Sequence, residues 1–116
     1  MQFPWIELHH LQQVDDLLRH SYSRPQIIYK HSHRCNLSSI SRRRLEQNGP
    51  FTPADHYFID VIAQRVISRH LSDALHVPHE SPQVLVVVNG ECIYDESHFG
   101  ITALELAEAI DPKTKG

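Results

Sequence analysis

Several features that define large protein classes are missing from this sequence. No stretch approaches the roughly 20 consecutive apolar residues of a membrane span. Residues 1–11 have no basic start and carry polar side chains within any apolar run, unlike a secretory signal. The formal net charge is −3, whereas a nucleic-acid partner usually requires a dominant basic surface. We therefore expect a cytoplasmic protein that binds neither a membrane nor nucleic acid.

The sequence is also poor in cysteine and glycine, with two and four residues. In a reducing compartment Cys35 and Cys92 are expected to be free, reactive or metal-binding rather than joined in a structural disulfide. The chain has no Gly-rich phosphate loop. It also lacks the cysteine phosphatase pattern, because Ser41 stands six residues after Cys35, where that pattern requires arginine.

What the sequence does contain is enough apolar material for one compact core. The chain has 116 residues, of which 41% are hydrophobic, and this size suits a single domain over residues 1–116. It has no internal repeat and no low-complexity linker. Residues 112–116 are predicted to be a loose tail.

The spacing of apolar residues predicts alternating helices and strands. Helical spacing occurs in residues 11–18, 37–45, 66–75 and 101–110, and strand-like runs occur in residues 26–30, 56–61, 83–88 and 91–94. Asn89-Gly90 predicts a hairpin that pairs the last two strands antiparallel. This order favours a thioredoxin-like α/β fold, with a central mixed four-stranded sheet flanked by helices, although another α/β arrangement also fits the pattern.

Cys35 lies where a predicted strand gives way to a helix. The first amides of a helix have no partners, and the helix dipole places partial positive charge there. These groups, with the neighbouring cation of Arg34, are expected to lower the pKa of the Cys35 thiol below its usual value of about 8.5. Ser38 stands where a dithiol site has its second cysteine. A serine can hydrogen-bond a thiolate but cannot close a disulfide, so an adduct on Cys35 would need an outside thiol for its release.

The segment His31-Ser32-His33-Arg34-Cys35-Asn36-Leu37-Ser38 resembles the active-site segment of the YtxJ-like monothiol bacilliredoxins. The resemblance continues at Arg65, Ile67 and Ser68, and at His79-Glu80-Ser81-Pro82-Gln83-Val84, and again at Asn89-Gly90 and Ser97-His98. The chain departs from the best-known family motif at Arg34 and Asn36, where threonine and proline stand in that motif.

This resemblance implies a thioredoxin-like fold and removal of bacillithiol from mixed disulfides on oxidised proteins, with Cys35 as the nucleophile. No cofactor is expected to be bound, and a low-molecular-weight thiol such as bacillithiol would be the co-substrate. The partners would be S-thiolated client proteins and a thiol or thioredoxin-type reductant that recycles Cys35. The residues expected to contact the thiol or the client are Ser32, Arg34, Ser38, Ser81 and Pro82.

The resemblance also predicts a cis Ser81–Pro82 bond that faces Cys35, although a trans proline is common at the start of a strand. Cys92 is expected to be a small core residue rather than a resolving thiol. The run Arg42-Arg43-Arg44 is expected to be a solvated helix face, although it could attract bacillithiol, which carries two carboxylates on a malate group.

Two other functions remain open from the sequence. The protein could be a redox sensor or binding module that is S-thiolated at Cys35 without turnover. It could also bind a metal, because His31, His33 and Cys35 would share one face of an extended segment, with His79 as a further ligand. The spacing matches no standard zinc pattern, so no metal site is assigned.

Overall fold

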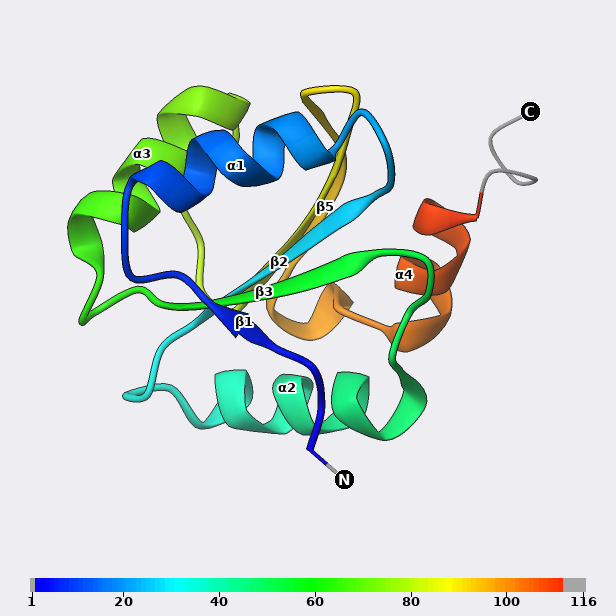
Figure 1. Ribbon diagram of the computed structural model, residues 1–116. Coiled ribbons are helices and arrows are strands. Elements are labelled where there is room, and N and C mark those ends of the chain that lie inside the picture. The colour runs from blue at the N-terminus through cyan, green and yellow to red at the C-terminus, as the bar shows by residue number, and fades with distance from the viewer. Residues whose placement is uncertain (1, 112–116) are drawn as a thin grey trace.

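The computed structural model describes residues 2–111, which form a mixed sheet with helices on both faces (Figure 1). In chain order the elements are β1 (Ile6–Glu7), α1 (Gln12–His20), β2 (Gln26–His31), α2 (Asn36–Asn48), β3 (Asp55–Asp60), α3 (Arg65–Leu75), β4 (Gln83–Val88), β5 (Glu91–Ser97), the short 3-10 helix η1 (His98–Gly100) and α4 (Ala103–Ile110). The strands lie in the order β1-β3-β2-β4-β5. β1, β3 and β2 are parallel, whereas β4 is antiparallel to β2 and to β5.

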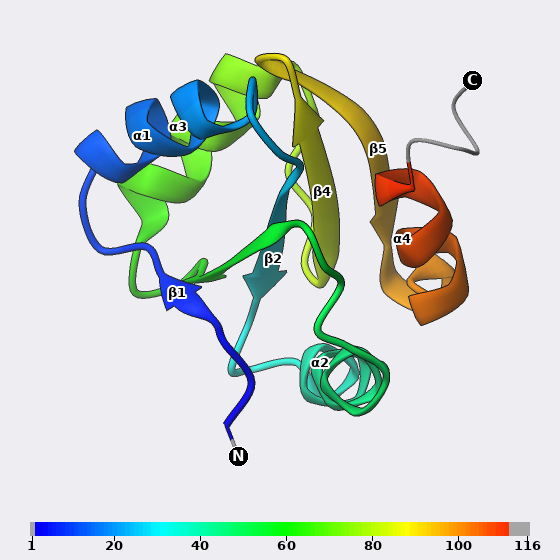
Figure 2. The same ribbon diagram turned by 45° about the vertical axis from the view of Figure 1, so that its right-hand side comes forward.

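The sheet separates two apolar cores, because successive side chains of a strand point to opposite faces. On one face Ile28 of β2 and Leu85 of β4 pack with residues of α1 and α3. On the other face Tyr29 and Val86 pack with residues of α2 and α4. Figure 2 shows these two pairs of helices on opposite sides of the sheet. Burial of both faces explains why β4 is an almost continuously apolar run and why the centre of β2, residues 27–29, is apolar.

The order of helices and strands is as predicted, but the sheet has five strands rather than four. The additional strand is β1, whose two exposed residues pair with Tyr57 and Phe58 of β3. A strand of two exposed residues has no apolar periodicity, so its sequence carries no strand signal. The predicted tail at 112–116 lies outside the described residues. None of the helices within residues 2–111 is long and apolar enough to cross a membrane.

The pairing of β2 with β4 determines which loops lie together. Lys30 pairs with Gln83 in antiparallel register, as expected. The loop after β2, which leads to Cys35, therefore lies at the same end of the sheet as the residues before β4, Ser81 and Pro82. The Ser81–Pro82 peptide bond is cis, as predicted.

A buried histidine stabilises the loop between α2 and β3. The Phe51 N–H donates to His56 Nε2 at 2.9 Å, and the His56 ring packs edge-on against Phe3. His56 is only 4% exposed. Burial lowers the pKa of His56, although the nearby Asp55 carboxylate opposes this. His56 must be neutral to accept this hydrogen bond.

We expect stability to fall in mild acid because of His56. Its folded-state pKa lies below the unfolded value of about 6.5, so its contribution is complete above that pH and is lost as the pH falls. Replacing His56 with leucine should cost about 1–3 kcal/mol of unfolding free energy, because the Phe51 N–H loses its partner. Urea titrations at about pH 7.5 and about pH 5.5 measure both effects. The exposed His70→Gln variant is the control, and a His56→Leu protein as stable and as acid-sensitive as the wild type would contradict the assignment.

Candidate thiol active site

Cys35 is the residue immediately before α2, in an extended conformation with φ −118° and ψ 114°. Its N–H donates to the Ser32 carbonyl at 3.1 Å, and its own carbonyl accepts from the Ser38 N–H at 3.0 Å. The chain therefore leaves β2, turns through residues 32–34 and enters the helix at Asn36. This places a partly exposed thiol at the end of α2 where the amides have no helical partners.

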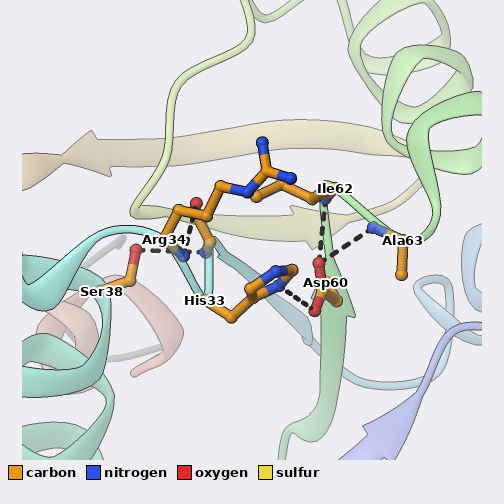
Figure 3. Close-up of polar contacts among 7 residues, drawn as sticks. His33, Arg34, Ser38, Asp60, Ile62 and Ala63 are labelled. Carbon is orange, nitrogen blue, oxygen red and sulfur yellow. Dashed lines mark hydrogen bonds and ion pairs between the residues drawn. The ribbon is translucent and has the colours of Figure 1, made fainter.

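The first turn of α2 stabilises the ionised form of this thiol. The Ser38 backbone amide lowers the pKa of Cys35 most, burial opposes this lowering, and the Leu37 amide and the Ser38 hydroxyl add to it. Arg34, which was expected to contribute, is not among these groups. Its side chain extends toward the turn that holds Ile62 (Figure 3). The anion is therefore stabilised by the helix amides rather than by the neighbouring cation.

Ser38 ties the loop before the helix to the helix itself. Its side chain is completely buried, and its Oγ accepts a hydrogen bond from the Ser32 N–H at 3.2 Å. The Ser38 carbonyl accepts from the Tyr29 hydroxyl at 2.7 Å. Ser32 in turn uses its Oγ to accept from the Arg34 N–H at 3.3 Å. Ser32 and Ser38 thus position the loop that carries the thiol, and Tyr29 is a support that the sequence did not indicate.

His33 and Asp60 form a second connection that sequence analysis missed. His33 Nδ1 lies 2.9 Å from Asp60 Oδ2 at the end of β3 (Figure 3). Asp60 Oδ1 accepts from the Ile62 and Ala63 amides at 2.9 and 3.0 Å. Burial acts to raise the pKa of Asp60, but the Ala63 amide, His33 and the Ile62 amide together lower it. An ionised Asp60 therefore joins the loop before Cys35 to the loop before α3.

The expectation that His31, His33 and Cys35 share one extended face is wrong. Residues 33 and 34 form a turn, so His33 lies exposed beside Asp60. His31 is buried, with its ring centroid 5.2 Å from that of Phe58. No group of three or more His, Cys, Asp or Glu residues within 2–111 is placed to hold a metal ion. The geometric basis of the metal-binding alternative is therefore missing.

A surface pocket of about 420 Å³ lies next to the Cys35 loop. Three segments that are distant in the sequence meet in it: the loop after β2, the turn after β3 together with α3, and the residues before β4. It is lined by Ser32, Val61, Ile62, Arg65, Ser68, Arg69, Ser72, His79 and Ser81. The antiparallel pairing of β2 with β4 brings Ser32 and Ser81 to this common site.

Known proteins match both the fold and the sequence. The family model for the monothiol bacilliredoxin BrxC matches residues 6–106. The chain belongs to the monothiol bacilliredoxin family. A solved structure described as a candidate oxidoreductase with a thioredoxin fold is 26% identical, with a TM-score of 0.81, and the match covers 93% of this chain and 95% of that one. The fold is therefore thioredoxin-like, and family and fold together support a thiol redox function.

More distant thioredoxins share the fold alone. Thioredoxin from Malassezia sympodialis is 16% identical with a TM-score of 0.72, and the match covers 95% of this chain and 90% of that one. Thioredoxin from Schistosoma mansoni is also 16% identical with a TM-score of 0.72, over 91% of this chain and 92% of that one. The cis Pro82 and the thiol at the start of α2 are thus placed on a thioredoxin scaffold.

The second cysteine of this bacilliredoxin has a different environment from the first. Cys92 lies in β5, half-buried, and its Sγ donates to the Tyr94 carbonyl at 3.3 Å. Burial is the main reason that the pKa of Cys92 is raised. It pairs with Val87, five residues along β4 from Pro82, which is about 16 Å at the usual rise of a strand. Cys92 is therefore a partly buried residue that packs against the core formed with α1 and α3.

The arginine run lies on α2, away from the residues that line the pocket. Arg42 is half-buried, with its guanidinium carbon 5.7 Å from the centre of the Phe58 ring and its Nε 3.7 Å from a Glu46 carboxylate oxygen. Arg43 and Arg44 are exposed. Arg43 and Arg44 therefore lie on a solvated helix face, whereas Arg42 packs against the Phe58 ring.

We expect Cys35 to be alkylated faster than an ordinary thiol at neutral pH, because its pKa is lowered by the amides of α2. In a Cys92→Ser background, the rate of iodoacetamide modification against pH should have its midpoint below about 8.5. Ser38→Ala should move the midpoint upward but leave it below that of a free thiol, since the Ser38 amide is retained. A midpoint at or above that of a free thiol would contradict the geometry described here.

Proposed function

We propose that this chain removes bacillithiol, or a similar low-molecular-weight thiol, from mixed disulfides on client proteins, with Cys35 as the nucleophile. The observation that carries this proposal is a single thiol of lowered pKa at the start of α2, with the buried Ser38 in place of a second cysteine. Such a site can accept one thiol but cannot release it as an internal disulfide.

The reaction is a thiol–disulfide exchange in two steps. In the first, the Cys35 thiolate attacks the sulfur of the small thiol in the client mixed disulfide. A disulfide forms between Cys35 and the small thiol, and the client leaves as a thiolate that takes a proton from solvent. In the second, a free thiol or a thioredoxin-type reductant attacks the small-thiol sulfur of the adduct. Cys35 leaves as a thiolate, and the electrons come from the attacking reductant.

The helix amides serve both steps in the same way. They stabilise the Cys35 thiolate before it attacks the mixed disulfide, and again when it is the leaving group of the second step. The turn fixed by Ser32, Ser38 and the His33–Asp60 contact holds the sulfur in one place through the cycle. We assign Arg34 to contacts with the arriving thiol, since its side chain is exposed and makes no contribution to the thiolate.

Ser81 and Pro82 are assigned to client binding. Pro82 has no N–H, and its carbonyl already accepts from the His98 N–H at 3.0 Å. A client segment would therefore pair with the backbone before Pro82, at Ser81, where the chain passes the Cys35 loop. We place this activity in the cytoplasm, where low-molecular-weight thiols keep protein thiols reduced.

The test uses a client enzyme inactivated by bacillithiol at a single cysteine. We expect the wild-type protein to restore client activity with repeated turnover when free bacillithiol is supplied. A parallel reaction with the glutathionylated client measures thiol preference. If Cys35 takes up one equivalent of thiol and never releases it, the protein is a sensor and the enzyme proposal is overturned. Equal rates with both thiols would overturn the assignment of bacillithiol but not of the reaction.

A further inference from the structure

The pocket beside the Cys35 loop is lined by cationic and neutral side chains only. Arg65 and Arg69 lie four residues apart, one turn along the same side of α3, and both line the pocket and are exposed. No aspartate or glutamate is among the described residues that line it. This local excess of positive charge occurs on a chain with a formal net charge of −3, so it is not a general property of the surface.

A buried lysine adds a third cation beneath this pocket. Lys30 is fully buried on the α3 side of β2, and its Nζ contacts Ser72 Oγ, a lining group, at 3.2 Å. Within residues 2–111 no carboxylate lies within ion-pairing distance of this Nζ. Burial lowers the pKa of Lys30 to about 8, and Glu80 opposes this only from a distance, since its carboxylate lies 2.8 Å from His98 Nε2. A buried lysine without a paired anion is uncommon, because burial penalises the charge.

The pocket is joined directly to the thiol loop. Ser32 lines the pocket, and its carbonyl accepts from the Cys35 N–H at 3.1 Å. The volume of about 420 Å³ is at the lower end of small-molecule sites. Cys35 does not itself line the pocket, so a ligand whose sulfur is bonded to Cys35 would reach the arginines and the Ser72 hydroxyl by extending past Ser32.

We propose that this pocket binds the carboxylates of an anionic low-molecular-weight thiol while Cys35 holds its sulfur. The inference rests on the proposed function and names the part of the thiol that is recognised. Guanidinium groups suit carboxylates because they donate two parallel hydrogen bonds. Below them, a bound carboxylate would favour the charged form of the Lys30 amine. Thiols without carboxylates would react at Cys35, but the pocket would not increase their binding affinity.

The test compares two mixed disulfides on the same client cysteine. One carries mercaptosuccinate, which has two carboxylates, and the other carries neutral 2-mercaptoethanol. The Arg65→Gln/Arg69→Gln variant should lose about tenfold or more in kcat/KM with the mercaptosuccinate adduct, because the carboxylates lose their charged hydrogen-bond donors. With the neutral adduct, kcat/KM of this variant should stay within about twofold of the wild-type value. Arg43→Gln/Arg44→Gln removes the same net charge from α2 and should leave both rates near wild type.

A binding experiment separates this inference from the reaction itself. Succinate titrated into the Cys35→Ser protein should shift the amide resonances of Ser68 and Ser72, and the shifts should be lost when both Arg65 and Arg69 are glutamine. If wild-type protein exchanges neither adduct, the proposed function fails, and the succinate titration still decides whether the pocket binds dicarboxylates. Three results would overturn the inference. The Arg65→Gln/Arg69→Gln variant could lose kcat/KM equally with both adducts, or the Arg43→Gln/Arg44→Gln control could lose as much. The third is a succinate titration that leaves the Ser68 and Ser72 resonances unshifted.

Discussion

Replacing Cys35 with serine is expected to reduce thiol transfer to the uncatalysed background, whereas Cys92→Ser should keep most of the activity. A serine hydroxyl does not attack a disulfide under these conditions, because the thiolate is the nucleophile in exchange. Cys92 cannot substitute, since burial raises its pKa and its strand position is about 16 Å from Pro82.

Two measurements check this pair of variants. Client reactivation gives the rates, and thermal unfolding shows that both proteins remain folded. Cys92 packs at the edge of the core formed by α1 and α3, so its serine variant should lose about 1 kcal/mol of stability without losing activity. If both folded variants lost activity equally, Cys92 would be a resolving thiol and the monothiol mechanism would be wrong.

The second large effect is expected from Ser38→Cys. The Ser38 hydroxyl is one of the groups that lower the pKa of Cys35, so a sulfur at position 38 would lie beside Cys35 on the first turn of α2. Mild oxidation should then form an intramolecular disulfide between Cys35 and the new thiol, and a dithiol reductant system should reduce it. The Ser32 N–H loses its present acceptor, so a stability loss of about 1 kcal/mol is also expected.

Ser39→Cys is the matched control, because it adds a thiol one residue further along the helix, on a different side. Free-thiol counts before and after oxidation, followed by peptide mapping, distinguish the two variants. The Ser38→Cys protein should lose two thiols as one intramolecular bond, whereas Ser39→Cys should keep its thiols or form dimers. Failure of Ser38→Cys to close this bond would mean that residues 35 and 38 do not share the helix start.

Much of the fold could be predicted because its elements carry local signals. Apolar runs mark β2 at residues 27–29 and β4 at residues 84–88, and Asn89-Gly90 marks the turn between β4 and β5. Thr102 caps α4 by accepting from the Glu105 N–H, as a threonine three residues before a glutamate often does. β1 was missed because its two residues owe their strand conformation to pairing with β3 rather than to any pattern of their own.

Sequence analysis could predict only those parts of the site that are formed by residues close together in the chain. The position of Cys35 before α2 and the absence of a second thiol at Ser38 follow from neighbouring residues. The contact between His33 and Asp60 joins residues 27 positions apart, and the contact between Lys30 and Ser72 joins residues 42 positions apart. Such pairs depend on how β2, β3 and α3 pack, and no local pattern encodes them. The turn at residues 33 and 34, which separates His31, His33 and Cys35, likewise has no local sequence signal.

The central claim is that Cys35 takes the small thiol from the client as a mixed disulfide. The most direct measurement is intact-mass spectrometry during a single turnover, with equimolar protein and a client that carries bacillithiol on one cysteine. We predict that the client loses one bacillithiol while the protein gains one, and that peptide mapping places the adduct on Cys35. An unchanged client, or an adduct on Cys92 with Cys35 unmodified, would contradict the account.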